Sequence, residues 1–141
     1  MHLTGKCHCG NILFDLVSAE APDRIPARAC ECSFCVKHGG VWTSMPGASL
    51  RIRLKDARRV SKYAFGTGTA RFHVCIDCGV VPVVTSEIDG RLFAVVSVNV
   101  LEGLDPSLVA RAASNFDGEA IEDRLARRKK HWISDVKFEQ G

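Results

Sequence analysis

The chain has 141 residues, of which 46% are hydrophobic and 25% charged, and its formal net charge is +3 at pH 7. This composition is typical of a globular protein, so we expect a single domain over residues 1–141. The charge is too small for a dedicated nucleic-acid binder and no apolar run reaches the ~20 residues that cross a bilayer, so we expect neither a nucleic-acid partner nor a membrane.

The location of the protein is predicted from its cysteines. The chain has seven of them, and the first motif lies too near the first methionine to leave room for a signal peptide. We therefore expect a cytoplasmic protein. In that compartment cysteines serve more often as metal ligands or catalytic groups than as disulfides.

Short alternating or β-branched stretches, bounded by glycine and proline, predict a mainly β chain. After a turn at Gly10, we expect strands at 11–17, 41–45, 50–54, 70–74, 80–85 and 92–98. The segment 18–26, with its two prolines, predicts a turn-rich connection. Residues 30–35 and 37–40 have the character of a loop and a flexible turn.

Two helices are predicted near the end of the chain. Asp105-Pro106 is typical of an N-cap followed by proline in the first turn, so we expect a short helix to about residue 113. The polar stretch 119–130 predicts a second helix. We interpret its basic part, from Arg124 to Lys130, as a solvated helix face, with a nucleic-acid patch as the less favoured alternative.

The cysteines form three clusters: Cys7-x-Cys9, Cys30-x-Cys32-x-x-Cys35 and Cys75-x-x-Cys78. The two clusters of two cysteines can together form one closed site of four thiolates, and the cluster of three can form one open site. Glycine follows each two-cysteine cluster, which favours a zinc-knuckle turn. We therefore expect a structural zinc on Cys7, Cys9, Cys75 and Cys78. The alternative is reduced structural or redox-active cysteines, although no βαβ pattern supports a thioredoxin-like use.

The cluster of Cys30, Cys32 and Cys35 cannot pair completely as disulfides, because an odd count leaves one thiol over. Three thiolates can surround one Zn²⁺ at about 2.3 Å each and leave the fourth tetrahedral position to another ligand. Catalytic zinc sites keep such a position, so these three cysteines are the predicted catalytic site. We expect two zinc ions per chain, the second one more labile because it has fewer ligands.

The order and spacing of these clusters, with Gly39-Gly40 behind the second and the later segment Val98-Asn99-Val100-Leu101-x-Gly103-Leu104-Asp105, resembles the glutathione-dependent formaldehyde-activating enzyme family. That family includes the centromere protein V-like proteins. The resemblance spans nearly the whole chain. It implies a mainly β fold of the Mss4-like type, with short antiparallel strands around a structural zinc and one or two short helices. It also implies zinc at both cysteine sites.

The resemblance further implies a carbon–sulfur lyase or synthase, in which glutathione or another small thiol adds to formaldehyde or a related small aldehyde to give an S-hydroxymethyl adduct. An electron-rich zinc with three thiolates suits the binding of a further thiolate. One alternative is a non-catalytic zinc module for protein or chromatin contacts. Another is an enzyme of the same family with a different thiol or electrophile.

The remaining polar candidates have weaker signals. His38 is a turn residue, a fourth zinc ligand or a proton donor, and the first interpretation is favoured. We expect His73 to be a strand histidine and Glu31 to be exposed. The arginines that could bind substrate carboxylates are instead expected on a solvated face; they are Arg51, Arg53, Arg58 and Arg59.

Overall fold

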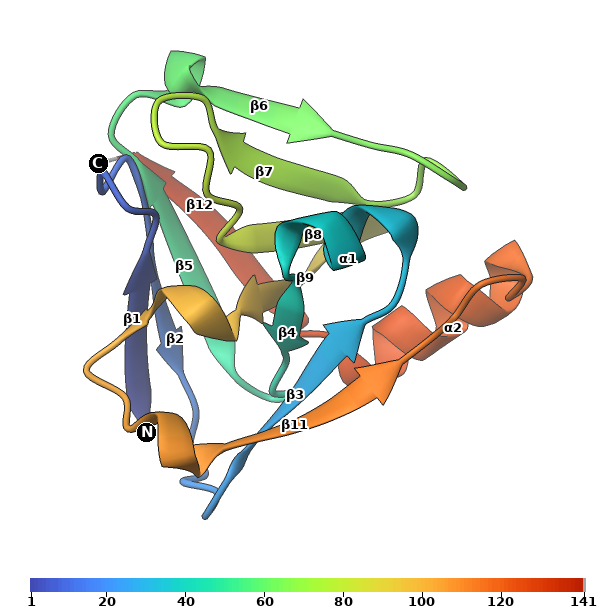
Figure 1. The fold of residues 1–141 in the computed structure, drawn as a ribbon, viewed down its shortest axis with the longest axis horizontal. Coiled ribbons are helices and arrows are strands. Elements are labelled where there is room, and N and C mark those ends of the chain that lie inside the picture. The colour runs from blue at the N-terminus through green and yellow to red at the C-terminus, as the bar shows by residue number, and fades with distance from the viewer. Residues whose placement is uncertain (141) are drawn as a thin grey trace.

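The computed structural model describes residues 1–140, and within them the chain forms two β-sheets and two α-helices (Figure 1). The five-stranded sheet has the order β10 (Leu101–Glu102), β1 (His2–Lys6), β2 (Ile12–Val17), β5 (Ser49–Leu54) and β12 (Asp135–Gln140). The seven-stranded sheet has the order β11 (Val109–Ser114), β3 (Ile25–Cys30), β4 (Val41–Thr43), β9 (Arg91–Ser97), β8 (Val83–Ile88), β7 (Arg71–Cys75) and β6 (Val60–Tyr63).

The helices are α1 (Ser33–His38) and α2 (Ile121–His131), with short 3₁₀ turns at Ala57–Arg59, Val98–Val100 and Pro106–Leu108. Strand pairing is antiparallel except for β11 on β3 and β12 on β5. The predicted mainly β fold with short antiparallel strands and short helices is confirmed. No helix within residues 1–140 is long and apolar enough to span a membrane.

The core between the sheets follows from strand alternation. In β2, Ile12, Phe14 and Leu16 point inward, and β5 contributes Leu50 and Ile52. Antiparallel register places Phe14 opposite Ile52 and Leu16 opposite Leu50. Each side chain buried in this way stabilises the fold by about 2 kcal/mol, before the cost of ordering the chain.

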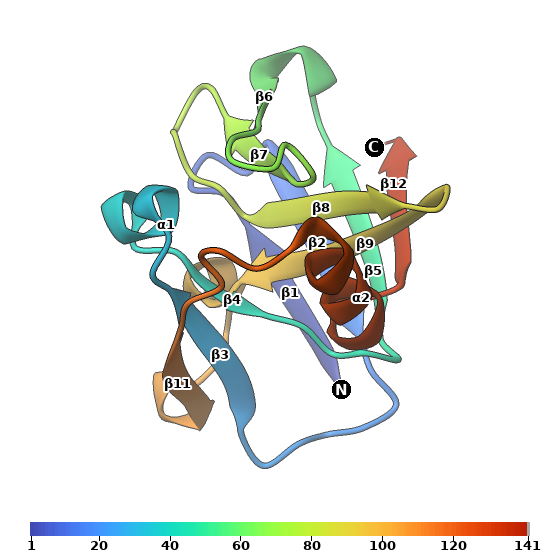
Figure 2. The same cartoon turned by 90° about the vertical axis from the view of Figure 1, so that its right-hand side faces the viewer.

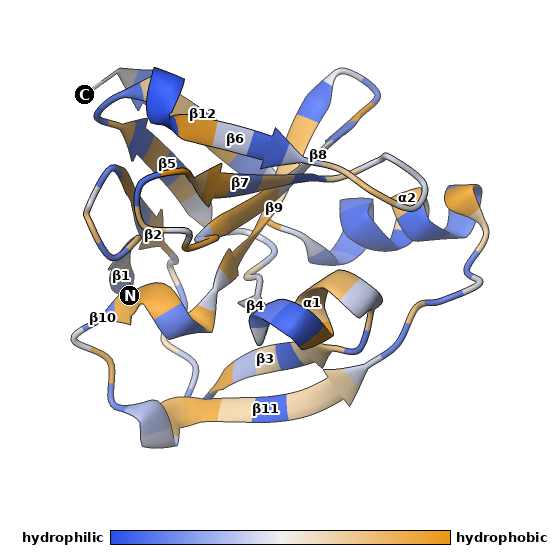
Figure 3. Ribbon diagram, turned by 45° about the horizontal axis from the view of Figure 1, so that its top comes forward, coloured by the Kyte–Doolittle hydropathy of each residue, from blue (hydrophilic) through white to orange (hydrophobic). Residues whose placement is uncertain are grey.

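Strands β8 and β9 separate this core from a second one. Val83 and Val96 pack into the core between the sheets, whereas their sequence neighbours Val84 and Val95 pack with Trp132 on the opposite face. A strand that is buried on both faces needs a continuous apolar run instead of alternation. Figure 3 shows the resulting hydrophobic colour along β9, against the mostly hydrophilic α2.

Helix α2 lies beside β8 and β9, as the turned view in Figure 2 shows. Backbone bonds between Ala94 and Ile133, 3.0 and 2.9 Å long, fix the end of the helix to β9. The Ser44 hydroxyl donates to the carbonyl of His131 at 2.8 Å, which satisfies one of the free carbonyls of the last turn.

The expected helix from Asp105 to residue 113 is wrong. Asp105 does act as an N-cap, because its carboxylate accepts from Ser107 N at 3.0 Å. The helical turn nevertheless ends at Leu108, and the chain continues as β11. The parallel pairing of β11 with β3 satisfies its backbone groups, so a tertiary partner outweighs the local helix signal.

Other boundaries were also misjudged. Strands β1, β3, β6, β10 and β12 were not predicted, and β3 overlaps the segment expected to be a turn-rich connection. The strand expected at 80–85 begins at Val83, after Pro82. Residues 30–35 are not a loop but a junction, in which β3 ends at Cys30 and α1 begins after Cys32. The flexible turn expected at 37–40 is wrong for Lys37 and His38, because α1 extends to His38 and is capped by Gly39.

Candidate metal centres and the adjoining pocket

The first centre joins the two sheets. Cys7 and Cys9 lie in the turn between β1 and β2, Cys75 is the last residue of β7, and Cys78 lies in the turn that follows it. The four sulfurs lie within 4.8 Å of one another, with Cys7 Sγ 3.8 Å and Cys75 Sγ 3.5 Å from Cys9 Sγ. Four sulfurs at 2.3 Å from a tetrahedral zinc would be about 3.8 Å apart, so this four-cysteine cluster fits a metal ion of that kind.

Both turns have the same construction. Gly10 and Gly79 follow the cysteine pairs with φ of 84° and 79°, a conformation that favours glycine. Gly10 N donates to the carbonyl of Cys7 at 3.1 Å, and Gly79 N donates to that of Cys75 at 2.7 Å. The turn directs Ile12 N to Cys7 Sγ at 3.3 Å. Such N–H groups stabilise a thiolate, which is the form of cysteine that binds metals.

The second centre is built from one short segment. Cys30 is the last residue of β3, Cys32 is the N-cap of α1, and Cys35 is buried in the first turn of that helix. Their sulfurs lie within 4.8 Å of one another. No other His, Cys, Asp or Glu atom of residues 1–140 joins this group at that distance. The structure therefore brings together three ligands, as predicted, and this three-cysteine cluster could hold a metal ion.

Two N–H groups support the sulfurs of the three-cysteine cluster. Cys35 N donates to Cys32 Sγ at 3.4 Å, which is the N-cap bond of α1, and Trp42 Nε1 donates to Cys35 Sγ at 3.3 Å. Gly40 makes room for this arrangement, since a Cβ there would lie 3.1 Å from Cys35 Sγ and 3.0 Å from Trp42 Nε1.

Because the sulfurs lie close together, their thiol groups have different pKa values. A hydrogen bond from the Cys35 thiol lowers the pKa of Cys30 to about 5, and the same contact, together with burial, raises the pKa of Cys35. In the four-cysteine cluster burial opposes ionisation of Cys78, but the backbone N–H groups of Cys9 and Val80 outweigh it and hold its pKa at about 6. Each cluster therefore offers a thiolate to a cation at neutral pH.

Only one of the clusters opens into a large cavity. Cys30, Cys32 and Cys35 line a pocket of about 450 Å³, and none of the other four cysteines lines it. Its apolar wall is the second core, formed by Trp42, Phe72, Val84, Val95 and Trp132. Enclosed apolar walls around a few polar groups are the usual features of a small-molecule site.

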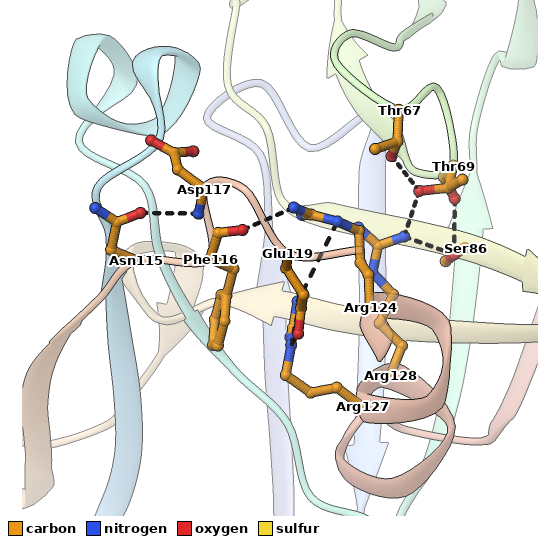
Figure 4. A network of polar contacts seen from close by, with 10 residues as sticks. All are labelled: Thr67, Thr69, Ser86, Asn115, Phe116, Asp117, Glu119, Arg124, Arg127 and Arg128. Atoms are coloured by element: carbon orange, nitrogen blue, oxygen red, sulfur yellow. Dashed lines mark hydrogen bonds and ion pairs between the residues drawn. The ribbon is translucent and has the colours of Figure 1, made fainter. Parts of the chain in front are cut away.

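The charged wall of this pocket was missed. Arg124, Arg127 and Arg128 of α2 line it, and Arg128 is 6% exposed, so the interpretation of this run as a solvated helix face is wrong for these three residues. Glu119 holds Arg127 through two bonds of 3.1 Å, and Arg128 donates to Thr69 and Ser86 (Figure 4). The spacing of these arginines, i, i+3 and i+4, puts them on one helix face and was the available signal.

The other predicted polar residues do not join the three sulfurs as possible ligands within 4.8 Å. The ring of His38 packs on Phe34 with centroids 4.5 Å apart, and His38 lines a separate, smaller cavity. His73 is buried and bonded to Thr85 Oγ1 at 2.8 Å. Burial lowers its pKa to about 4. Glu31 is exposed, as expected.

The arginines expected on a solvated face form ion pairs there. Arg51 contacts Asp135 at 3.1 Å and Arg53 contacts Asp15 at 3.6 Å. Arg58 pairs with Asp56 at 3.1 Å, and Arg59 pairs with Asp77. None of these four lines the large pocket, in agreement with the prediction.

Comparison with known proteins agrees with this architecture. A crystal structure of a Rhodobacter sphaeroides protein is similar to this chain, with a TM-score of 0.57 and 30% sequence identity over 74% of this chain and 92% of that one. A family model described as glutathione-dependent formaldehyde-activating enzyme matches residues 2–116. The match contains both cysteine clusters and ends before α2. The chain therefore belongs to the glutathione-dependent formaldehyde-activating enzyme family.

Proposed function

We propose that the protein is a zinc-dependent carbon–sulfur lyase or synthase, which adds a small thiol such as glutathione to formaldehyde or a related small aldehyde. The observation that carries the proposal is the position of the three-cysteine cluster in the wall of the pocket. The four-cysteine cluster has no such access, and we assign it a structural zinc. Family membership supports the reaction class.

In the reaction, the sulfur of the thiol bonds to the carbonyl carbon, the C=O π bond breaks, and the thiol proton passes to the oxygen. The reverse reaction breaks the same C–S bond. A zinc ion held by three thiolates would supply an open coordination position at which an incoming thiol loses its proton.

The residues of the chain prepare this site for small reactants. Cys30, Cys32 and Cys35 hold the cluster in place through the rigid junction of β3 and α1. The N–H of Trp42 fixes Cys35 Sγ, and the apolar wall that includes Phe72 limits the access of water. Exclusion of water strengthens the electrostatic interactions within a site and limits side reactions.

The test compares the wild type with Cys32→Ser. Serine is a preferred N-cap, so the substitution removes one sulfur ligand and keeps α1. We expect elemental analysis to give two zinc ions in the wild type and one in the variant. NMR exchange measurements with ¹³C-formaldehyde and glutathione should show adduct formation above the uncatalysed rate only in the wild type.

One zinc ion in both proteins, with no rate above that of buffer, would contradict the proposal and support a non-catalytic zinc module for protein or chromatin contacts. Full adduct formation by Cys32→Ser would also contradict it. A cytoplasmic location, where glutathione is available, is part of the same proposal and follows from the use of reduced cysteines.

A further inference from the structure

The pocket has an excess of positive charge on the wall made by β3 and α2. Four guanidinium groups line it, against the two carboxylates of Asp117 and Glu119 and the sulfurs of the three-cysteine cluster; the guanidinium groups belong to Arg28, Arg124, Arg127 and Arg128. Buried or half-buried charges are normally paired, because their removal from water is costly. The partners of each arginine therefore indicate how much charge is left for a ligand.

Glu119 is already used by two of the arginines (Figure 4). It accepts two bonds of 3.1 Å from Arg127 and lies 3.8 Å from Arg124 Nε. Arg124 also donates to the carbonyl of Phe116 at 2.8 Å, and the guanidinium of Arg127 lies 3.6 Å from the centre of the Phe116 ring. One carboxylate thus serves two guanidinium groups, and Asp117 is exposed at the rim.

Within residues 1–140, Arg128 makes side-chain hydrogen bonds only to neutral groups. It is 6% exposed, and its Nη1 donates to the hydroxyls of Thr69 at 2.9 Å and Ser86 at 3.1 Å. Its Nε is buried without an acceptor among the described residues, as is Nε1 of Trp132 beside it. Burial, followed by the charges of Arg124 and Arg127, lowers the pKa of Arg128 to about 10. The positive charge at this end of the pocket is therefore incompletely compensated.

Arg28 is the arginine nearest to the three-cysteine cluster along the chain. It precedes Cys30 by two residues in β3, so both side chains lie on the same face of the strand, with Cα atoms about 7 Å apart. Within residues 1–140 no hydrogen bond or ion pair engages its half-buried guanidinium. Arg28 lines the same pocket as the three cysteines of the cluster and the three arginines of α2.

We propose that the substrate of this pocket carries a carboxylate that binds Arg28, at the positively charged wall, while its sulfur or carbonyl end lies at the three-cysteine cluster. This inference rests on the proposed function, because it uses the same pocket, and it adds the residue that binds the carboxylate of the substrate. The planar guanidinium matches a carboxylate in a two-bond geometry. A zinc ion held by three thiolates would leave a net negative charge at the other end, which disfavours the carboxylate there and so favours one direction of binding.

The α2 arginines lie beyond residue 116, where the family match ends. The cysteine clusters belong to the matched part, whereas much of the charged wall comes from the segment that follows it. The α2 arginines add positive charge to the wall on which Arg28 binds the carboxylate.

The experiment measures binding to the zinc-loaded protein by tryptophan fluorescence, since the two tryptophans of the chain, Trp42 and Trp132, both line the pocket. The probes are 3-mercaptopropionate and its methyl ester, which differ in charge and share the thiol. We expect the wild type to bind the acid at least about tenfold more tightly than the ester, as for one desolvated charge-assisted pair.

Arg28→Gln should bring the ratio of the two affinities close to one, with little effect on the ester. Arg28→Lys should keep part of the preference, because it keeps the charge and loses the two-bond geometry. Arg111→Gln is the matched control: Arg111 lies on the adjacent strand β11, is exposed and does not line the pocket. This variant should leave the ratio of the two affinities unchanged. Circular dichroism should be used to check that all variants fold.

The outcomes separate this inference from the proposed function. Equal binding of acid and ester by the wild type overturns the inference, even if both thiols bind only when zinc is present and adduct formation is catalysed. Butyrate, which has no thiol, should bind Cys32→Ser as well as the wild type and lose affinity in Arg28→Gln. That result supports the carboxylate site even if the wild type fails to catalyse adduct formation. An unchanged preference for the acid in Arg28→Gln also overturns the inference.

Discussion

The two cysteine clusters use the same ligand chemistry in opposite surroundings. The four-cysteine cluster takes its sulfurs from two turns far apart in the sequence and connects the two sheets, away from the large pocket. The three-cysteine cluster takes its sulfurs from one junction within six residues and lines that pocket. The comparison teaches that the tertiary setting, more than the type of side chain, distinguishes the cluster that joins the sheets from the cluster that lines a pocket.

The largest expected difference is in stability. Cys75→Ser removes a fully buried ligand that ties β7 to the turn between β1 and β2. We expect it to lower the free energy of unfolding by more than about 4 kcal/mol, because binding of a structural metal contributes directly to folding. Chemical denaturation, with zinc analysis of the same sample, measures this.

Cys32→Ser provides the contrast. It should lower the free energy of unfolding by no more than about 1 kcal/mol, because its sulfur links one junction to itself and serine preserves the N-cap. Similar losses of stability in the two variants would break the distinction between the clusters.

A chelator should remove the two metal ions at different rates. We expect one zinc ion per chain to leave at least about ten times faster than the other, since a site with fewer protein ligands in an open pocket is more accessible than one closed by four. A colorimetric chelator follows the release in time.

The fast phase should disappear in Cys32→Ser, and loss of the fast ion should leave the circular dichroism spectrum unchanged. If the fast phase instead accompanied unfolding, the faster ion would belong to the four-cysteine cluster and the assignment would be reversed.

A smaller effect is expected at Gly40. In Gly40→Ala the new Cβ would lie 3.0 Å from Cys35 Cβ and 3.1 Å from Cys35 Sγ, so this sulfur must move. We expect zinc affinity at the three-cysteine cluster to fall about 10-fold to 100-fold, as when a supporting contact of a metal ligand is lost. Competition with a zinc indicator measures the affinity.

Gly39→Ala is the matched control. Gly39 caps α1 with φ of 65°, and a Cβ there meets no atom within 4 Å. This substitution should cost about 1 kcal/mol of stability through backbone strain and leave the zinc affinity unchanged. Equal affinity losses in both variants would show that α1, and not the packing of Cys35, decides metal binding.

The smallest effect is expected beside the four-cysteine cluster. Asp77 lies between its two later cysteines and pairs with Arg59 on the surface. Removal of this exposed pair in Asp77→Asn should change Tm by no more than about 3 °C, because exposed ion pairs contribute little. Calorimetry of the zinc-loaded protein measures it. A much larger drop would mean that the ion pair, and not the metal, fixes this turn.

Much of the fold and of the site was predictable because it depends on local sequence. Alternation in β2 and β5 directs every second side chain into the core, and this pattern needs no knowledge of the partner strand. The three sulfurs at the end of β3 lie close together because only a few residues separate them. The two glycine turns brought their cysteine pairs into the expected shape.

Only the tertiary structure decided the rest. Residues 109–114 follow a helix N-cap signal, yet they form a strand because β3 offers a parallel partner. The basic run of α2 resembles a solvated face, and its arginines line a pocket because the helix is fixed against β8 and β9. The sequence by itself indicated the candidate ligands and the direction of most side chains, since these follow from residue type and local period. What each ligand set faces depends on contacts between distant segments, and short-range patterns carry no information about them.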